Sequence, residues 1–87
     1  MDEPHKSQLL FTQLVIMFHA ACMQQLGKVK HPVTEKLEKD LPAAQSTIDL
    51  LDMLHVKTKG NLSTEEEQLL TQVIQEVKLM YVQEAKT

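Results

Sequence analysis

The sequence predicts an all-α fold: a three-helix arrangement forming a single helical domain over residues 1–87. The length of 87 residues suits one small domain. Two Gly, three Pro and an aromatic content of 3% argue against an all-β fold. Apolar residues recur at helical spacing over three long segments, and these segments are separated by Gly or Pro.

The first helix is expected at about residues 7–26, with Ser7 as its N-cap and Gly27 ending it in the left-handed conformation. Residues 1–6 and 85–87 are expected to fray. The helix has two predicted apolar faces. Its main face comprises Leu10, Phe11, Leu14, Met17, Phe18, Ala21 and Cys22. A back stripe comprises Leu9, Thr12, Ile16, Ala20 and Met23, at the spacing of a helix–helix contact.

The second helix is expected at about residues 41–59, with Asp40 as its N-cap and Pro42 in its first turn. Its apolar face comprises Leu41, Ala44, Ile48, Leu51 and Leu54, with Ala43 and Leu50 at one edge. The third helix is expected at about residues 63–84, opened by a capping box from Ser63 to Glu66. Its apolar face comprises Leu69, Leu70, Val73, Ile74, Val77, Met80 and Tyr81.

The link between the second and third helices is short, so these two helices are predicted to form an antiparallel hairpin. Four residues, Gly60, Asn61, Leu62 and Ser63, are interpreted as a structural junction rather than as an anion-binding loop, because the Walker pattern is absent. The link over residues 28–40 is long enough to cross a whole helix. The direction of the first helix relative to the second therefore stays open.

Charge and cysteine content exclude several classes of function. The net charge is −3 and the chain has no Arg, which argues against nucleic-acid binding. The single cysteine, Cys22, makes neither an intramolecular disulfide nor a zinc cage alone, so a reducing cytoplasm is expected. Residues 9–23 approach a lipoprotein cleavage box, but the segment before them lacks the positive charge of a secretory signal. Residues 9–23 are also too short a stretch to span a membrane.

Two pairs of metal-ligating residues lie three positions apart, His19 with Cys22 and Asp52 with His55. Each pair offers only two ligands, fewer than a metal centre in a helical bundle needs. We therefore expect Cys22 to be a buried thiol and His55 to bond to Asp52. No metal, no cofactor and no catalytic residue is expected.

The junction Lys57-Thr58-Lys59-Gly60-Asn61-Leu62 is the most specific part of a resemblance that also includes Leu26-Gly27, Asp40-Leu41 and Tyr81-Val82. On these residues the chain resembles the bacterial domain-of-unknown-function family 1844. The resemblance extends from about Phe11 to Val82. It implies a short, helical, cytoplasmic bacterial protein, and it implies no reaction.

A helix that is apolar on two sides must be covered on two sides, and a three-helix monomer covers only one of them well. We therefore expect a non-enzymatic interaction or assembly module that self-associates through the back stripe of the first helix, most commonly as a two-fold dimer. Another helical protein is the alternative partner. A small-molecule or metal-binding protein and peripheral membrane attachment through the first helix are the alternative functions.

Overall fold

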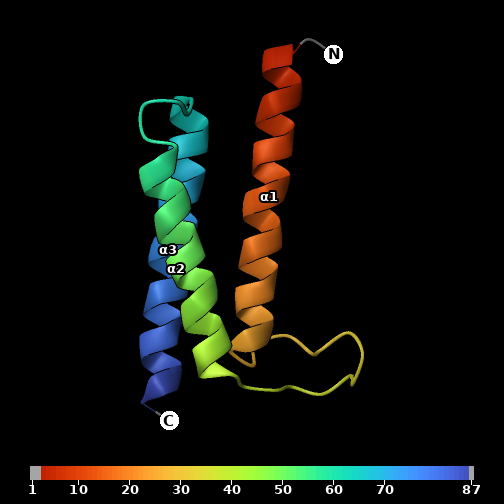
Figure 1. The fold of residues 1–87 in the computed structure, drawn as a ribbon. Helices are drawn as coiled ribbons and strands as arrows, with labels where there is room; N and C mark the ends of the chain where they lie inside the picture. Colours follow the sequence, from red (N-terminus) through yellow and green to blue (C-terminus); the bar gives the residue numbers. More distant parts are fainter. Residues whose placement is uncertain (1–2, 87) are drawn as a thin grey trace.

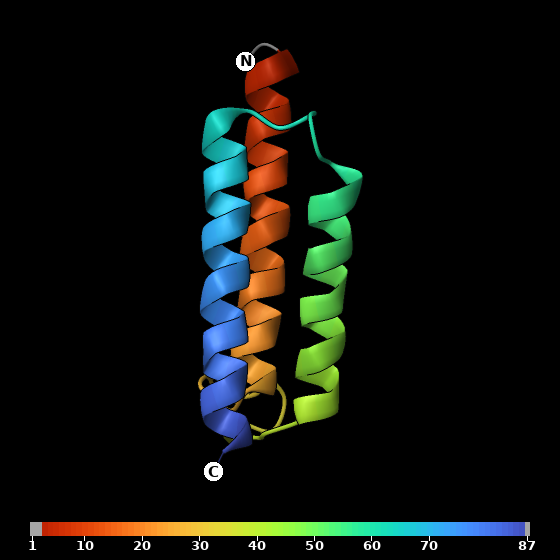
Figure 2. The ribbon, with the colours of Figure 1, turned by 90° about the vertical axis from the view of Figure 1, so that its left-hand side faces the viewer.

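A computed structural model of the chain describes residues 3–86, and within them there are three helices: α1 (Glu3–Gln25), α2 (Leu41–Lys57) and α3 (Thr64–Ala85). The helices lie lengthwise side by side, and α2 runs antiparallel to both α1 and α3 (Figures 1 and 2). Each helix packs against the other two. The bundle measures 43 × 25 × 15 Å, so it is elongated along the helices. The predicted all-α class, three-helix arrangement and α2–α3 hairpin are confirmed.

All three helices contribute to the core. Its buried residues are Val15, Cys22, Leu26, Ala44, Ile48, Leu51, Leu70, Val73, Ile74 and Val77. Thr47 is the buried polar residue among them, and its hydroxyl donates to Gln25 Oε1 at 2.7 Å. The predicted apolar faces of α2 and α3 supply most of this core, as expected from their spacing.

The start of α1 differs from the prediction. It begins at Glu3, so Ser7 lies inside the helix and is not its N-cap. Pro4 explains the earlier start, because proline is well suited to the first turn of a helix. Residues 3–6 are therefore helical rather than frayed. Residues 1–2 and 87 lie outside the described residues.

The other helix ends follow the predicted capping residues closely. The Asp40 carboxylate accepts from the Ala43 N–H at 3.1 Å and caps α2. That helix ends at Lys57, two residues earlier than expected, with Thr58 as its C-cap: the Thr58 N–H donates to Leu54 O at 3.0 Å, and the Thr58 hydroxyl donates to the same oxygen at 2.7 Å. The capping box of α3 is complete, with Ser63 as the N-cap, and the helix continues to Ala85.

The rotation of α1 about its own axis is a second correction. Its buried side is centred on Val15, which neither predicted face contained, together with Cys22. Phe11 and Phe18 pack on the same side at helical spacing. Other members of the predicted main face point outward instead: Leu10, Leu14 and Met17 are 54%, 38% and 66% exposed. Because α1 is apolar around most of its circumference, periodicity alone does not specify which side is buried.

The link between α1 and α2 returns the chain to the point where it left α1. The Asp40 N–H donates to Gln25 O at 2.7 Å, and Leu26 and Lys39 form an isolated antiparallel bridge. Gly27 begins the link with φ of 77°, in the left-handed region predicted for it. These contacts determine the direction of α1, which the sequence left open. The intervening segment projects from the end of the bundle (Figure 1).

Candidate interaction surface

The side of α1 turned away from the core carries a continuous group of apolar side chains. We call it the outer face of α1, formed by Leu9, Leu10, Leu14, Ile16, Met17 and Ala20. Its large side chains are between 38% (Leu14) and 66% (Met17) exposed. Gln13 is a polar interruption within it. Contiguous apolar patches of this kind on soluble proteins mark surfaces that bind other molecules.

The predicted back stripe divides in the structure. Leu9, Ile16 and Ala20 lie together on the outer face of α1, whereas Thr12 and Met23 are half-buried. Sequence reasoning missed Leu10, Leu14 and Met17 as surface residues, because it assigned them to the core. The only signal available for them was the width of the apolar arc on α1, which is greater than a single packed stripe requires.

The first two turns of α1 pack against little. Every residue from Glu3 to Leu10 is exposed, and this end of the helix extends beyond the start of α3 (Figure 2). Residues 7–27 also contain no Asp, Glu, Lys or Arg. The outer face of α1 is therefore both apolar and uncharged, a composition typical of the centre of a protein–protein interface.

The two long edges of this face differ. On the side of α3, His19 Nε2 lies 3.2 Å from Glu76 Oε1, so that edge is polar. On the side of α2, the neighbouring exposed residues are Leu50 and Met53, at 45% and 47% exposure. The apolar surface therefore continues from α1 towards α2 and not towards α3.

Cys22 is buried in the core, and burial raises the pKa of its thiol. A raised pKa keeps the thiol protonated at neutral pH and disfavours both nucleophilic attack and metal binding. The predicted partner for a metal, His19, is turned towards Glu76 instead. No group of three or more metal-ligating side chains occurs in the part of the chain that the structure describes.

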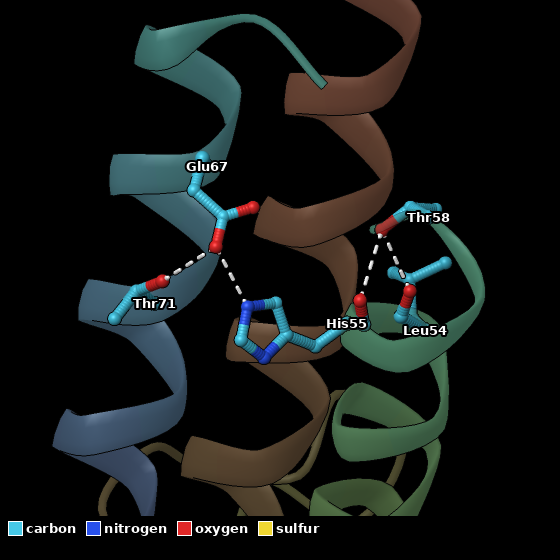
Figure 3. A network of polar contacts seen from close by, with 5 residues as sticks. All are labelled: Leu54, His55, Thr58, Glu67 and Thr71. Atoms are coloured by element: carbon cyan, nitrogen blue, oxygen red, sulfur yellow. Dashed lines mark hydrogen bonds and ion pairs between the residues drawn. The ribbon is translucent and has the colours of Figure 1, made fainter. Parts of the chain in front are cut away.

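A polar network joins α2 to α3 near the hairpin end (Figure 3). His55 Nε2 lies 2.7 Å from Glu67 Oε1, and the Thr71 hydroxyl donates to the same oxygen at 3.5 Å. The expected bond between His55 and Asp52 is therefore wrong. Asp52 instead lies 3.0 Å from Lys78 Nζ, so both members of the predicted pair find partners on α3. These pairs are partly exposed, and we interpret them as links between helices rather than as catalytic groups.

The junction between α2 and α3 has a structural geometry. Gly60 has φ of 84°, in the left-handed region that favours glycine. The Asn61 N–H donates to Thr58 O at 2.9 Å, and Leu62 packs against the core. The Ser63 hydroxyl accepts from the Glu66 N–H at 3.1 Å. These contacts account for the Gly-Asn-Leu-Ser sequence without a ligand.

The opposite end of the bundle is held by a charged clasp that the sequence did not predict. Lys28 Nζ and Lys39 Nζ lie 2.6 and 3.1 Å from the two carboxylate oxygens of Glu84. Hydrogen bonds from Lys28 and then Lys39 lower the pKa of Glu84 below its ordinary value. The clasp connects both ends of the α1–α2 link to the last turn of α3.

The fold and its surface define a small all-α protein with an exposed apolar helix face. Comparison with known families gives its membership: the family described as Domain of unknown function (DUF1844) matches residues 8–83, so the chain belongs to that family. This confirms the resemblance seen in the junction sequence. No curated protein and no solved structure matches the chain. Among the described residues, no helix combines the length and apolar character needed to span a bilayer.

Proposed function

We propose that the protein is a non-catalytic assembly module that self-associates through the outer face of α1. The observation that carries this proposal is the exposure of Leu9, Leu10, Ile16 and Met17 on one uncharged side of a helix. Exposed apolar residues on this scale are costly to leave in water, and a second copy of the chain covers them without any further gene product.

The free energy gained by covering these residues can be compared with the cost of association. Complete burial of such a side chain contributes about 1.5–3 kcal/mol. Because these four are roughly half exposed, covering them contributes about 3–7 kcal/mol per copy, or about 7–13 kcal/mol for a dimer. Association itself costs about 4–15 kcal/mol. The outer face of α1 alone is therefore close to balance, and a stable dimer requires additional apolar area.

The remaining features fit an assembly module. The charged pairs that the structure describes, such as His55 with Glu67, connect segments of the bundle at its surface. The buried, unpaired thiol of Cys22 suits a reducing compartment, and we expect the bacterial cytoplasm.

Sedimentation of the purified protein at micromolar concentration tests the proposal. We expect a dimer, and we expect Ile16→Glu to shift it towards monomer by placing a charge in the interface. Leu79→Glu is the matched control, since Leu79 is 59% exposed on the far side of α3. Circular dichroism verifies that both variants remain helical. A wild-type chain that sediments as a folded monomer contradicts the proposal.

A further inference from the structure

A second row of residues at helix-contact spacing runs along α2, separate from the face that packs into the core, and its apolar members are Ala43, Leu50 and Met53. Ala43, Ser46, Leu50, Met53 and Lys57 follow one another at intervals of three and four residues. This is the spacing of a helix–helix contact in a coiled coil. Leu50 and Met53 at the centre of the row are 45% and 47% exposed. The described chain therefore leaves a helix-contact row on α2 uncovered.

The row on α2 lies beside the outer face of α1. The Asp40 N–H donates to Gln25 O, and the Thr47 hydroxyl donates to Gln25 Oε1, so the first turns of α2 lie beside the last turns of α1. Because α2 runs antiparallel to α1, Leu50 and Met53 lie further along, beside the middle turns of α1. At that height the outward side of α1 carries Met17 and Ala21. We call the surface formed by Leu14, Met17, Ala21, Leu50 and Met53 the α1–α2 seam.

The α1–α2 seam has the properties of a surface that pairs with itself. Its residues carry no charge, so two identical seams meet without opposing like charges. The charged pairs nearest to it, His19 with Glu76 and Asp52 with Lys78, both involve α3 and lie on the other side of the bundle. On α2 the seam is bordered by one charge of each sign, Asp49 and Lys57.

Resting on the proposed self-association, we propose that the α1–α2 seam is the centre of the interface and that a second copy of this chain occupies it. A two-fold axis parallel to the helices sets each α2 against the partner's α1. All neighbouring helices in the resulting four-helix core then run antiparallel, as α1 and α2 already do within one copy. In this arrangement Leu50 and Met53 face the partner's Leu14, Met17 and Ala21.

The area argument favours the same arrangement. The outer face of α1 alone is close to balance for association, and the seam adds Leu50 and Met53 of α2 to the buried surface. A helix from a different protein would cover the same residues. Every copy of this chain would then need its own partner molecule, and any copy without one would keep its seam exposed. Self-pairing covers every seam with one chain type.

Substitutions on α2 test the proposal, because the proposed function places only α1 residues in the interface. We expect Leu50→Glu and Met53→Glu each to weaken dimerisation at least about 100-fold in sedimentation equilibrium. Val56→Glu is the matched control on the same helix, since Val56 is 72% exposed and lies outside the row. We expect it to leave dimerisation unchanged. Circular dichroism and urea unfolding verify that all three variants fold.

The outcomes separate this inference from the proposed function. A wild-type monomer overturns both. A wild-type dimer that Ile16→Glu splits, but that Leu50→Glu and Met53→Glu leave intact, supports self-association and overturns the seam.

A third measurement tests the axis: mixed Met17→Cys and Met53→Cys chains should form an inter-chain disulfide under mild oxidation. A disulfide that forms preferentially between two Met17→Cys chains would instead place two α1 helices face to face, and it would contradict the proposed axis.

Discussion

The α2–α3 hairpin and α1 are held in place by different means. Both helices of the hairpin have side-chain N-caps, from Asp40 and Ser63, and ion pairs such as Asp52 with Lys78 connect them. In contrast, every residue in the first two turns of α1 is classed as exposed, and the outer face of this helix is apolar. The outward side of the hairpin thus mixes charged residues with exposed apolar residues such as Leu50 and Met53, whereas the outer face of α1 is apolar and uncharged. In the proposed function, the hairpin supplies most of the core and α1 supplies much of the surface for assembly.

The largest expected loss of stability comes from truncating a buried side chain of the hairpin, and it can be compared with truncating an exposed side chain of α1. Leu51 is 0% exposed between the helices, so Leu51→Ala should lower the free energy of unfolding by about 2–5 kcal/mol. Leu10→Ala on α1, at 54% exposure, should change it by less than about 0.5 kcal/mol in dilute monomer. Urea unfolding followed by circular dichroism measures both.

The concentration dependence of that comparison is informative. If the outer face of α1 is an interface, Leu10→Ala becomes more destabilising as protein concentration rises, because unfolding is then linked to dissociation. Equal effects of Leu51→Ala and Leu10→Ala in dilute solution would show that the outer face of α1 is already covered within one chain, and the contrast between the two regions would be wrong.

The junction of the hairpin provides a smaller test. Gly60 has φ of 84°, and a Cβ added there would meet nothing within 4 Å, so the cost of substitution is conformational rather than steric. Gly60→Val should therefore lower the free energy of unfolding by about 1–2 kcal/mol. Gly60→Asn is the control, because asparagine tolerates the left-handed region and should be affected less. Equal stability of the two variants would contradict this reading of the turn.

The same contrast explains what the sequence could predict. Caps and turns depend on a few adjacent residues, so Asp40, Gly60 and Ser63 could be placed from local rules. The apolar faces of α2 and α3 were also predictable, since polar residues on the opposite sides define them. The exposed apolar edge residues Leu50 and Met53 did not affect that assignment, because they lie outside the main stripe.

The properties of α1 depended on long-range contacts that no local pattern encodes. Neither of its predicted stripes included Val15, because leucines and methionines on the outer side gave an equally apolar arc. The partner of His55 was misassigned for a related reason. Asp52 is near in sequence, but Glu67 on α3 lies 2.7 Å away once the hairpin closes. The direction of α1 likewise depends on Asp40 bonding to Gln25 across the link.

The smallest effect concerns the clasp that joins the α1–α2 link to α3. The pKa of Glu84 is lowered in the folded protein, chiefly by Lys28 and then by Lys39, from an ordinary value of 4.5. A lowered pKa stabilises the fold at pH values above the unfolded-state pKa, and that contribution disappears as pH falls through the folded-state pKa. Glu84→Gln should therefore destabilise the protein slightly at neutral pH and not at all in acid well below pH 4.5. High salt should shrink the neutral-pH difference, because both lysines are partly exposed. Urea midpoints across this pH range measure the effect. If the difference in urea midpoint between wild type and Glu84→Gln does not change with pH, the Glu84 side chain acts through packing. Its charge then does not stabilise the contact between the α1–α2 link and α3.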